Sequence, residues 1–448
     1  MRWLFLLAYT CSGMAGLIYE VTWTRLLTLY VGHTTAAASA VVAAFLGGLA
    51  IGAAIGGRVA SRLAPRDCVR VYALLEVVVA VAALLLPLEL QAFTPLLRWA
   101  YADGDAGWLF SLVRLTSCVV MVFVPATALG ATFPMAVRWM AERSARPARQ
   151  AGLLYALNTV GAAAGALLAG FTLIPAIGLA WTTRVGVGAS LFAAACAFLV
   201  AQWAPAGAEA AAPAPAARGA ERKGRRAAPT ASPATASVPL WLPALVLGVS
   251  GCASLMHEIV WTRILALLLG PTTYAFAAAL AAVITGVALG SAIGSAVVGR
   301  TPHPARWLAG ALAGAAITSA WTSALAGGWV PRYVAHQMAT SAWVLDQLFR
   351  EGSLLTALLV IPTAICFGAA FPLALALPVR GSEGEPAGSS AARFGIVYAI
   401  NTIGAVTGSL LAGFVLVPLI GLQGTLTLVS VTVVAIATLA VAASHLTR

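Results

Sequence analysis

Residues 12–25 read SGMAGLIYEVTWTR, and residues 250–263 read SGCASLMHEIVWTR. The two stretches are 238 residues apart, and the same offset recurs in a row of glycines. In that row Gly48, Gly52 and Gly56 match Gly286, Gly290 and Gly294. After a small insertion the offset becomes 243, which matches Asn158 with Asn401 and Gly178 with Gly421. So many identities in one order indicate a tandem duplication.

The composition places both copies in a membrane. Of 448 residues 61% are hydrophobic and only 9% are charged, which is more apolar surface than a soluble domain of this size can cover. Apolar stretches long enough to cross the bilayer recur along almost the whole chain. Because backbone groups in lipid must bond internally, we predict an all-α polytopic membrane protein of about twelve helices, as two parallel six-helix repeats.

Each half contains six expected spans. In the N-terminal repeat, residues 1–203, they lie near 4–31, 34–63, 69–91, 109–140, 150–175 and 179–203. In the C-terminal repeat, residues 239–448, they lie near 239–269, 272–299, 305–328, 353–378, 391–417 and 422–445. The Ala/Pro-rich, basic stretch 204–238 has no apolar periodicity and is predicted to be a disordered cytoplasmic linker.

The basic residues predict the orientation. The net charge is +12, but nineteen of the 26 Lys and Arg residues fall on one side of the expected spans, five on the other, and Arg25 and Arg263 inside spans. The positive side is cytoplasmic, so both termini are expected there, and no nucleic-acid partner is expected. The strong preference for Arg over Lys is typical of GC-rich bacterial genomes, which favours a bacterial cytoplasmic (inner) membrane.

Three acidic residues lie well inside expected spans, Glu20, Glu258 and Glu76, whereas Glu89 lies at the end of one. Intramembrane carboxylates are costly and are candidate functional residues. Glu20 and Arg25 are about 140° apart around one helix, so we expect cross-pairing instead, of Glu20 with Arg263 and of Glu258 with Arg25. The alternatives are a structural ion pair that fixes how the halves dock and a substrate or proton site.

Further candidates surround these glutamates. Trp23 and Trp261 follow them three residues later, and Tyr19 and His257 precede them and break the symmetry of the repeats. Glu76 is expected to form a salt bridge at the membrane boundary, close to Arg70. Asn158 and Asn401 are interpreted as hydrogen-bonding contacts between helices, with ligand binding as the alternative.

Other patterns point to packing rather than chemistry. The glycines at every fourth residue allow neighbouring backbones to approach closely. The six cysteines are scattered, without a CxxC pair, and are interpreted as packing residues. Metal-ligand clusters, nucleophile elbows and phosphate loops are absent from the sequence, so we expect no enzyme activity, metal or cofactor.

These motifs carry a family resemblance. The Glu20-x-x-Trp23-x-Arg25 run, preceded by Tyr19 in its first copy, and the segment from Tyr155 to Gly178, each present twice, resemble the membrane region of bacterial fused major-facilitator/spermidine-synthase-like proteins. In fused members a soluble aminopropyltransferase-like domain follows, whereas this sequence stops at Arg448.

The resemblance implies a membrane protein connected with polyamine-like cations, and the parallel repeats imply a major-facilitator-like fold. Three hypotheses of function follow from the sequence as a whole. The first is a secondary transporter of a small solute, either a polyamine-like cation, which Glu20 and Glu258 would suit, or an anion, which Arg25 and Arg263 would suit. The second is a non-transporting membrane subunit or scaffold for a separate aminopropyltransferase-like enzyme. The third is a membrane enzyme that acts on lipids or quinones.

Overall fold

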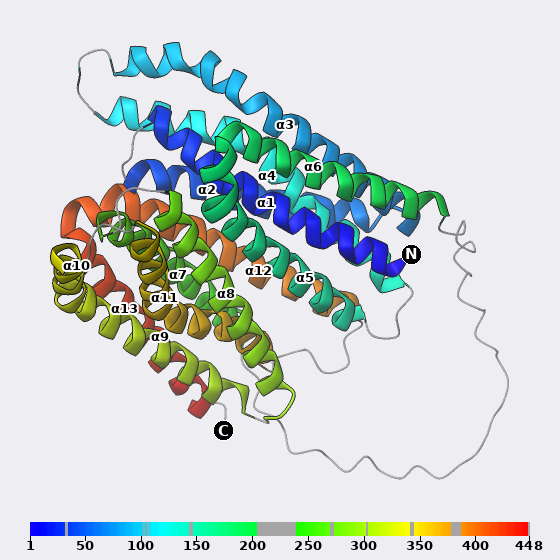
Figure 1. The fold of residues 1–448 in the computed structure, drawn as a ribbon. Coiled ribbons are helices and arrows are strands. Elements are labelled where there is room, and N and C mark those ends of the chain that lie inside the picture. The colour runs from blue at the N-terminus through cyan, green and yellow to red at the C-terminus, as the bar shows by residue number, and fades with distance from the viewer. Residues whose placement is uncertain are drawn as a thin grey trace, which may run out of the picture.

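Helices form both halves of the chain in the computed structural model (Figure 1). The structure describes residues 1–31, 35–101, 104, 107–142, 147–203, 239–268, 273–301, 303–340, 345–377 and 387–446, and these contain no strand. The predicted linker 204–238 lies outside the described residues. In Figure 1 the N-terminal half (blue to green) and the C-terminal half (green to red) form two adjacent bundles.

The helix bounds follow the repeat. The first half contains α1 (Arg2–Val31), α2 (Thr35–Ala60), α3 (Pro65–Ala100), α4 (Trp108–Glu142), α5 (Pro147–Leu167), the π-helix η1 (Leu168–Leu173) and α6 (Ile174–Trp203). The second half contains α7 (Trp241–Leu268), α8 (Thr273–Val298), α9 (Pro304–Gly327), α10 (Trp329–Thr340), α11 (Leu345–Leu375), α12 (Ala387–Leu410), the π-helix η2 (Leu411–Leu416) and α13 (Val417–Leu446).

The described residues provide enough apolar helix for twelve membrane crossings. The described residues contain 10 helical stretches long and apolar enough to cross a membrane, and two of these, Leu153–Trp203 and Ile396–Ala442, have 51 and 47 residues. Each long stretch is interrupted by a glycine in the left-handed region, Gly178 with φ 75° and Gly421 with φ 71°. Because a side chain disfavours that conformation, glycine permits the chain to turn back there, and each stretch crosses twice. The breaks fall where the sequence predicts them.

Three boundaries differ from prediction. The helix α3 has 36 residues, about 54 Å at 1.5 Å per residue, whereas the predicted span stops at residue 91. The helix α11 begins at Leu345 rather than near 353, and the short helix α10 is not predicted at all. Hydropathy indicates where a helix leaves the hydrocarbon core of the bilayer. The helix can continue beyond that point as long as its backbone hydrogen bonds are made.

The predicted glycine rows form close helix contacts within each half. The helix α2 packs on α4, and α8 packs on α11. A Cβ atom at Gly52 would overlap the carbonyl oxygen of Thr127, and one at Gly290 would overlap that of Ile365. Only glycine therefore permits these backbones to lie so close.

The halves meet through α2 with α12 and through α5 with α8. The Ser409 hydroxyl donates a hydrogen bond to the Ser39 carbonyl at 3.1 Å, and the buried side chains of Ile18 and Ala169 pack against Leu280. Ser39 lies near the start of α2 and Ser409 near the end of α12. Among the described residues, these packing contacts gather toward the face opposite the chain termini.

Candidate functional site

Glu20 and Glu258 occupy equivalent positions in α1 and α7, and their carboxyl groups interact electrostatically across the boundary between the halves. Both side chains are half-buried. In the part of the chain that the structure describes, neither carboxyl group has a hydrogen bond or an ion pair. The duplication thus brings two equivalent carboxylates within electrostatic reach of one another, and the described residues provide a hydrogen-bond donor to neither.

The expected cross-pairing with the arginines is not present. In the described regions no ion pair within 4.0 Å joins Glu20 to Arg263 or Glu258 to Arg25. Both arginines are half-buried and interact elsewhere in the chain. In parallel repeats both arginines lie about 7.5 Å further along the helix axis than both glutamates, so exchanging partners between the halves does not close that offset.

The two tryptophans of the repeated motif are packing residues in this structure. Trp23 and Trp261 are each 1% exposed. The Trp23 ring stacks on Tyr19 with centroids 5.2 Å apart, and the Trp261 ring lies 6.1 Å from that of His257. Successive residues of a helix point about 100° apart, so Tyr19 and Trp23 face the core of their half while Glu20 faces the other half.

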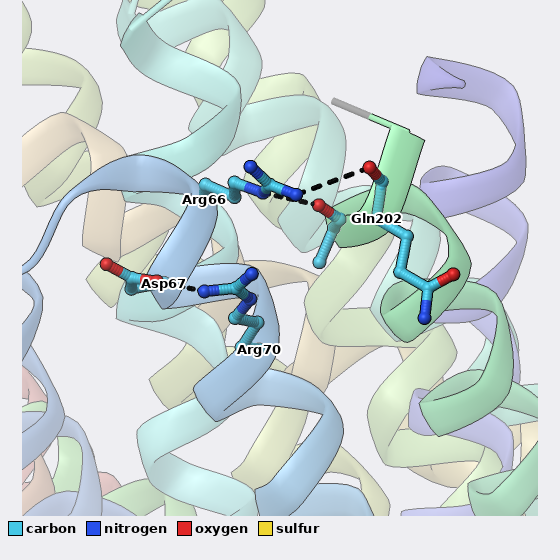
Figure 2. Close-up of polar contacts among 5 residues, drawn as sticks. Arg66, Asp67, Arg70 and Gln202 are labelled. Atoms are coloured by element: carbon cyan, nitrogen blue, oxygen red, sulfur yellow. Dashed lines mark hydrogen bonds and ion pairs between the residues drawn. The ribbon is translucent and has the colours of Figure 1, made fainter. Parts of the chain in front are cut away.

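Glu76 is not part of a boundary salt bridge. It is 0% exposed, and Arg70 instead binds Asp67 at 2.9 Å (Figure 2). Figure 2 also shows Arg66, whose guanidinium donates hydrogen bonds to the carbonyl oxygens of Ala201 and Gln202 at the end of α6. At the start of α3, Asp67 and Arg70 therefore pair with each other, and Arg66 binds the end of α6. Glu76 lies about two turns further along α3, out of their reach.

A cluster of hydroxyl groups surrounds Glu76. The Ser12 hydroxyl of α1 donates a hydrogen bond to Glu76 Oε1. The Tyr19 hydroxyl lies 3.3 Å from Ser190 Oγ of α6, and Ser190 and Tyr72 lie beside the Glu76 carboxyl group. We call Ser12, Tyr19, Tyr72, Glu76 and Ser190 the Glu76 cluster; each member is at most 2% exposed.

His257, the counterpart of Tyr19, has different surroundings. It is 3% exposed, and its Nε2 atom has no hydrogen-bond partner in the described structure. The ring lies 6.3 Å from that of Phe367. The C-terminal half therefore has an aromatic contact where the N-terminal half has a hydroxyl network.

Asn158 and Asn401 lie at equivalent helix contacts. A Cβ atom at Gly13 of α1 would overlap Asn158 of α5, and one at Gly251 of α7 would overlap Asn401 of α12. Both asparagines are thus held against the helices that carry Glu20 and Glu258, one in each half.

Two tyrosines outside the predicted site residues also lie within electrostatic reach of one another. Tyr155 of α5 and Tyr398 of α12, equivalent in the repeats, interact across the halves although they are 47% and 42% exposed. Their matching positions in the duplication are a signal for their proximity. Ser12 and Ser190 carry no such signal, because only the packing of α1, α3 and α6 brings them to Glu76.

The donor set does not favour a metal centre. Among the described residues, no group of three or more His, Cys, Asp and Glu side chains is placed to hold a metal ion.

Comparison with known proteins identifies the fold. No protein-family model and no curated protein matches the chain. Its structure is similar to that of a bacterial homologue of the iron transporter ferroportin in an outward-facing state, with 12% identity, a TM-score of 0.56 and coverage of 100% of this chain and 99% of that one. The chain has a major-facilitator-like fold.

A second structure supports the same assignment. A bacterial homologue of the human lysosomal transporter Spinster, in an inward-facing and occupied conformation, has 13% identity and a TM-score of 0.55, with coverage of 99% of this chain and 96% of that one. The predicted fold class, a polytopic all-α membrane protein, is confirmed. The expected link to spermidine-synthase-like proteins is not among these similarities.

Proposed function

We propose that the chain is a secondary transporter that binds a small organic cation, of the polyamine type, between Glu20 and Glu258. The observation that carries the proposal is the facing pair of half-buried carboxylates, neither of which has a protein donor among the described residues. Two such charges inside a membrane protein repel one another unless a proton or a bound cation neutralises them, and a cationic solute can replace the proton. A solute with two ammonium groups meets that requirement with one charge for each half.

An organic cation fits better than a metal ion. The neighbour related to ferroportin has a structure with soaked iron, which makes a divalent metal the natural competitor. A metal would need further ligands, and the described residues provide no third His, Cys, Asp or Glu. An ammonium group needs only hydrogen-bond acceptors, which two carboxylates supply.

Transport would proceed by alternating access. The packing between the halves lies toward the face opposite the termini, through Ser39 with Ser409 and Ile18 with Leu280. Toward the termini, Tyr155 and Tyr398 face one another while remaining nearly half exposed. We propose that this conformation admits solute from the side of the termini, which the charge distribution predicts to be the cytoplasm.

Uptake into proteoliposomes tests the proposal, with radiolabelled putrescine, spermidine and Fe²⁺ as probes. We expect saturable uptake of a di- or triamine, reduced about ten- to a hundredfold by Glu20→Gln or Glu258→Gln, because each change removes one charge-assisted contact. Glu89→Gln in α3 is the matched control, since it makes the same chemical change away from the pair.

Two results would contradict this function. Uptake unaffected by either substitution would exclude the carboxylate pair as the site. Absence of uptake of every probe by the wild-type protein would favour the second hypothesis, a membrane subunit that holds a separate aminopropyltransferase-like enzyme.

A further inference from the structure

We propose that the Glu76 cluster is a proton-binding site and that the proton on Glu76 is the coupling ion of transport. The proposal rests on the transport function above and adds the ion that drives it. Its observations are separate from those at Glu20 and Glu258, since Glu76 lies inside the N-terminal half, between α1, α3 and α6.

The surroundings of Glu76 favour a neutral carboxylic acid. The side chain is 0% exposed, Oε1 accepts the Ser12 hydroxyl, and Oε2 is buried without a hydrogen-bond partner in the described structure. A carboxylate buried in this way needs a cation or several donors. Oε2 is the oxygen left to carry the proton.

The titratable groups around Glu76 are all uncharged when protonated. From α1 they are Tyr9, Cys11 and Tyr19, from α3 Tyr72, and from α6 Cys196, which lies beside Cys11. The polar group of α4 in these surroundings is the Thr132 hydroxyl, which lies next to Tyr9. Among the described residues none of these groups supplies a positive charge, so a proton on Glu76 itself is the simplest means of neutralisation.

The duplication provides an internal control for a purely structural role. The third helix of the second half, α9, contains no acidic residue, and Val433 stands at the position equivalent to Ser190. The corresponding helices α7, α9 and α13 still pack together. The second repeat therefore packs its third helix without a carboxylate, so a buried glutamate is not a general requirement of the repeat.

The cluster is connected to the proposed solute site through α1. Tyr19, which lies 3.3 Å from Ser190, precedes Glu20 directly. A movement of α1 that follows binding at Glu20 would change the contacts that Tyr19 and Ser12 make around Glu76. Proton uptake from water on one side and release on the other would then accompany each movement of solute.

Infrared spectroscopy of the purified protein in lipid vesicles tests the site without a solute. At pH 7 we expect a carbonyl stretching band of a protonated carboxylic acid that is lost in Glu76→Gln and kept in Glu89→Gln, the matched control on the same helix. A band unchanged by Glu76→Gln would overturn the proposal. Should Glu76→Gln not fold, Ser12→Ala is expected to shift the band because it removes the hydrogen bond to Oε1, and an unshifted band would overturn the proposal.

A second measurement separates this site from the transport function. Vesicles loaded with a pH-sensitive dye report proton movement when spermidine is added. We expect proton flux in the wild type, and in Glu76→Gln exchange of labelled spermidine with the proton flux lost. Spermidine transport with proton flux intact in Glu76→Gln overturns the proton site alone. An infrared band that depends on Glu76, in a protein that does not transport spermidine, supports the proton site and overturns the proposed solute.

Discussion

Tyr19, Glu20 and Trp23 lie within little more than one turn of α1 and differ sharply in exposure. Tyr19 and Trp23 are 0% and 1% exposed, whereas Glu20 is half-buried at the boundary between the halves. The repeated Glu-x-x-Trp motif therefore combines a residue that faces the other half with a residue that holds its own helix in place. These roles can be separated by substitution.

Trp23→Ala is expected to lower the free energy of unfolding by about 3–5 kcal/mol, because it removes a large, fully buried side chain and leaves a cavity. Thermal unfolding in detergent measures the change. Trp3→Ala is the control, since Trp3 is 82% exposed and its loss leaves no cavity. Equal unfolding temperatures for both variants would contradict the packing role of Trp23.

At the residue scale the repeat makes the Glu20–Glu258 pair predictable, because equivalent residues close to a twofold axis must lie close to one another. The predicted pairing with Arg25 and Arg263 is wrong because it rests on the angle between glutamate and arginine around the helix. The distance between them along the helix axis is the same in both halves and keeps them apart. The environment of Glu76 is not predictable from α3 alone, since Ser12 and Ser190 belong to helices far apart in the sequence.

At the scale of elements, glycines determine which helices touch. Gly52 and Gly47 both lie in α2, but a Cβ atom at Gly52 would overlap the Thr127 carbonyl oxygen, whereas nothing lies within 4 Å of one at Gly47. The two positions form a matched pair, because they differ in what the helix meets there.

Gly52→Ala is expected to destabilise the protein by about 1–3 kcal/mol, because α2 and α4 must separate to admit a methyl group. Gly47→Ala is expected to be neutral or to stabilise by about 1 kcal/mol, through the better helix propensity of alanine. Thermal stability in detergent distinguishes the two. A stable Gly52→Ala variant would mean that α2 and α4 are not in such close contact.

Helix ends are the least predictable feature at this scale. The breaks at Gly178 and Gly421 are evident from proline and glycine in the sequence. The length of α3 and the presence of α10 are not evident from the sequence, because the end of α3 and the whole of α10 lie outside the most apolar stretches of the chain.

For the whole molecule, the packing between the halves determines which side is closed. Ser39 and Ser409 are both 0% exposed and join the halves through a hydrogen bond of 3.1 Å. The parallel repeat predicts that the halves meet around one axis. It does not predict on which face they close, because alternating access changes that face while the sequence stays the same.

A disulfide between Ser39→Cys and Ser409→Cys is expected to hold this face closed and to abolish net uptake of spermidine into proteoliposomes. A reducing agent should restore the uptake, and each single-cysteine variant serves as control for the six native thiols. Full transport by the cross-linked protein would show that the halves need not separate at this face.

The asymmetry of the duplication has an electrical consequence. Each half contributes one carboxylate to the proposed solute site, Glu20 or Glu258, but among the described residues the proposed proton site, Glu76, belongs to the N-terminal half alone, since α9 has no acidic residue. A dication exchanged for one proton moves one net charge across the bilayer in each cycle. Each such charge is worth about 2.3 kcal/mol per 100 mV, so the membrane voltage would act on this transporter together with the pH difference.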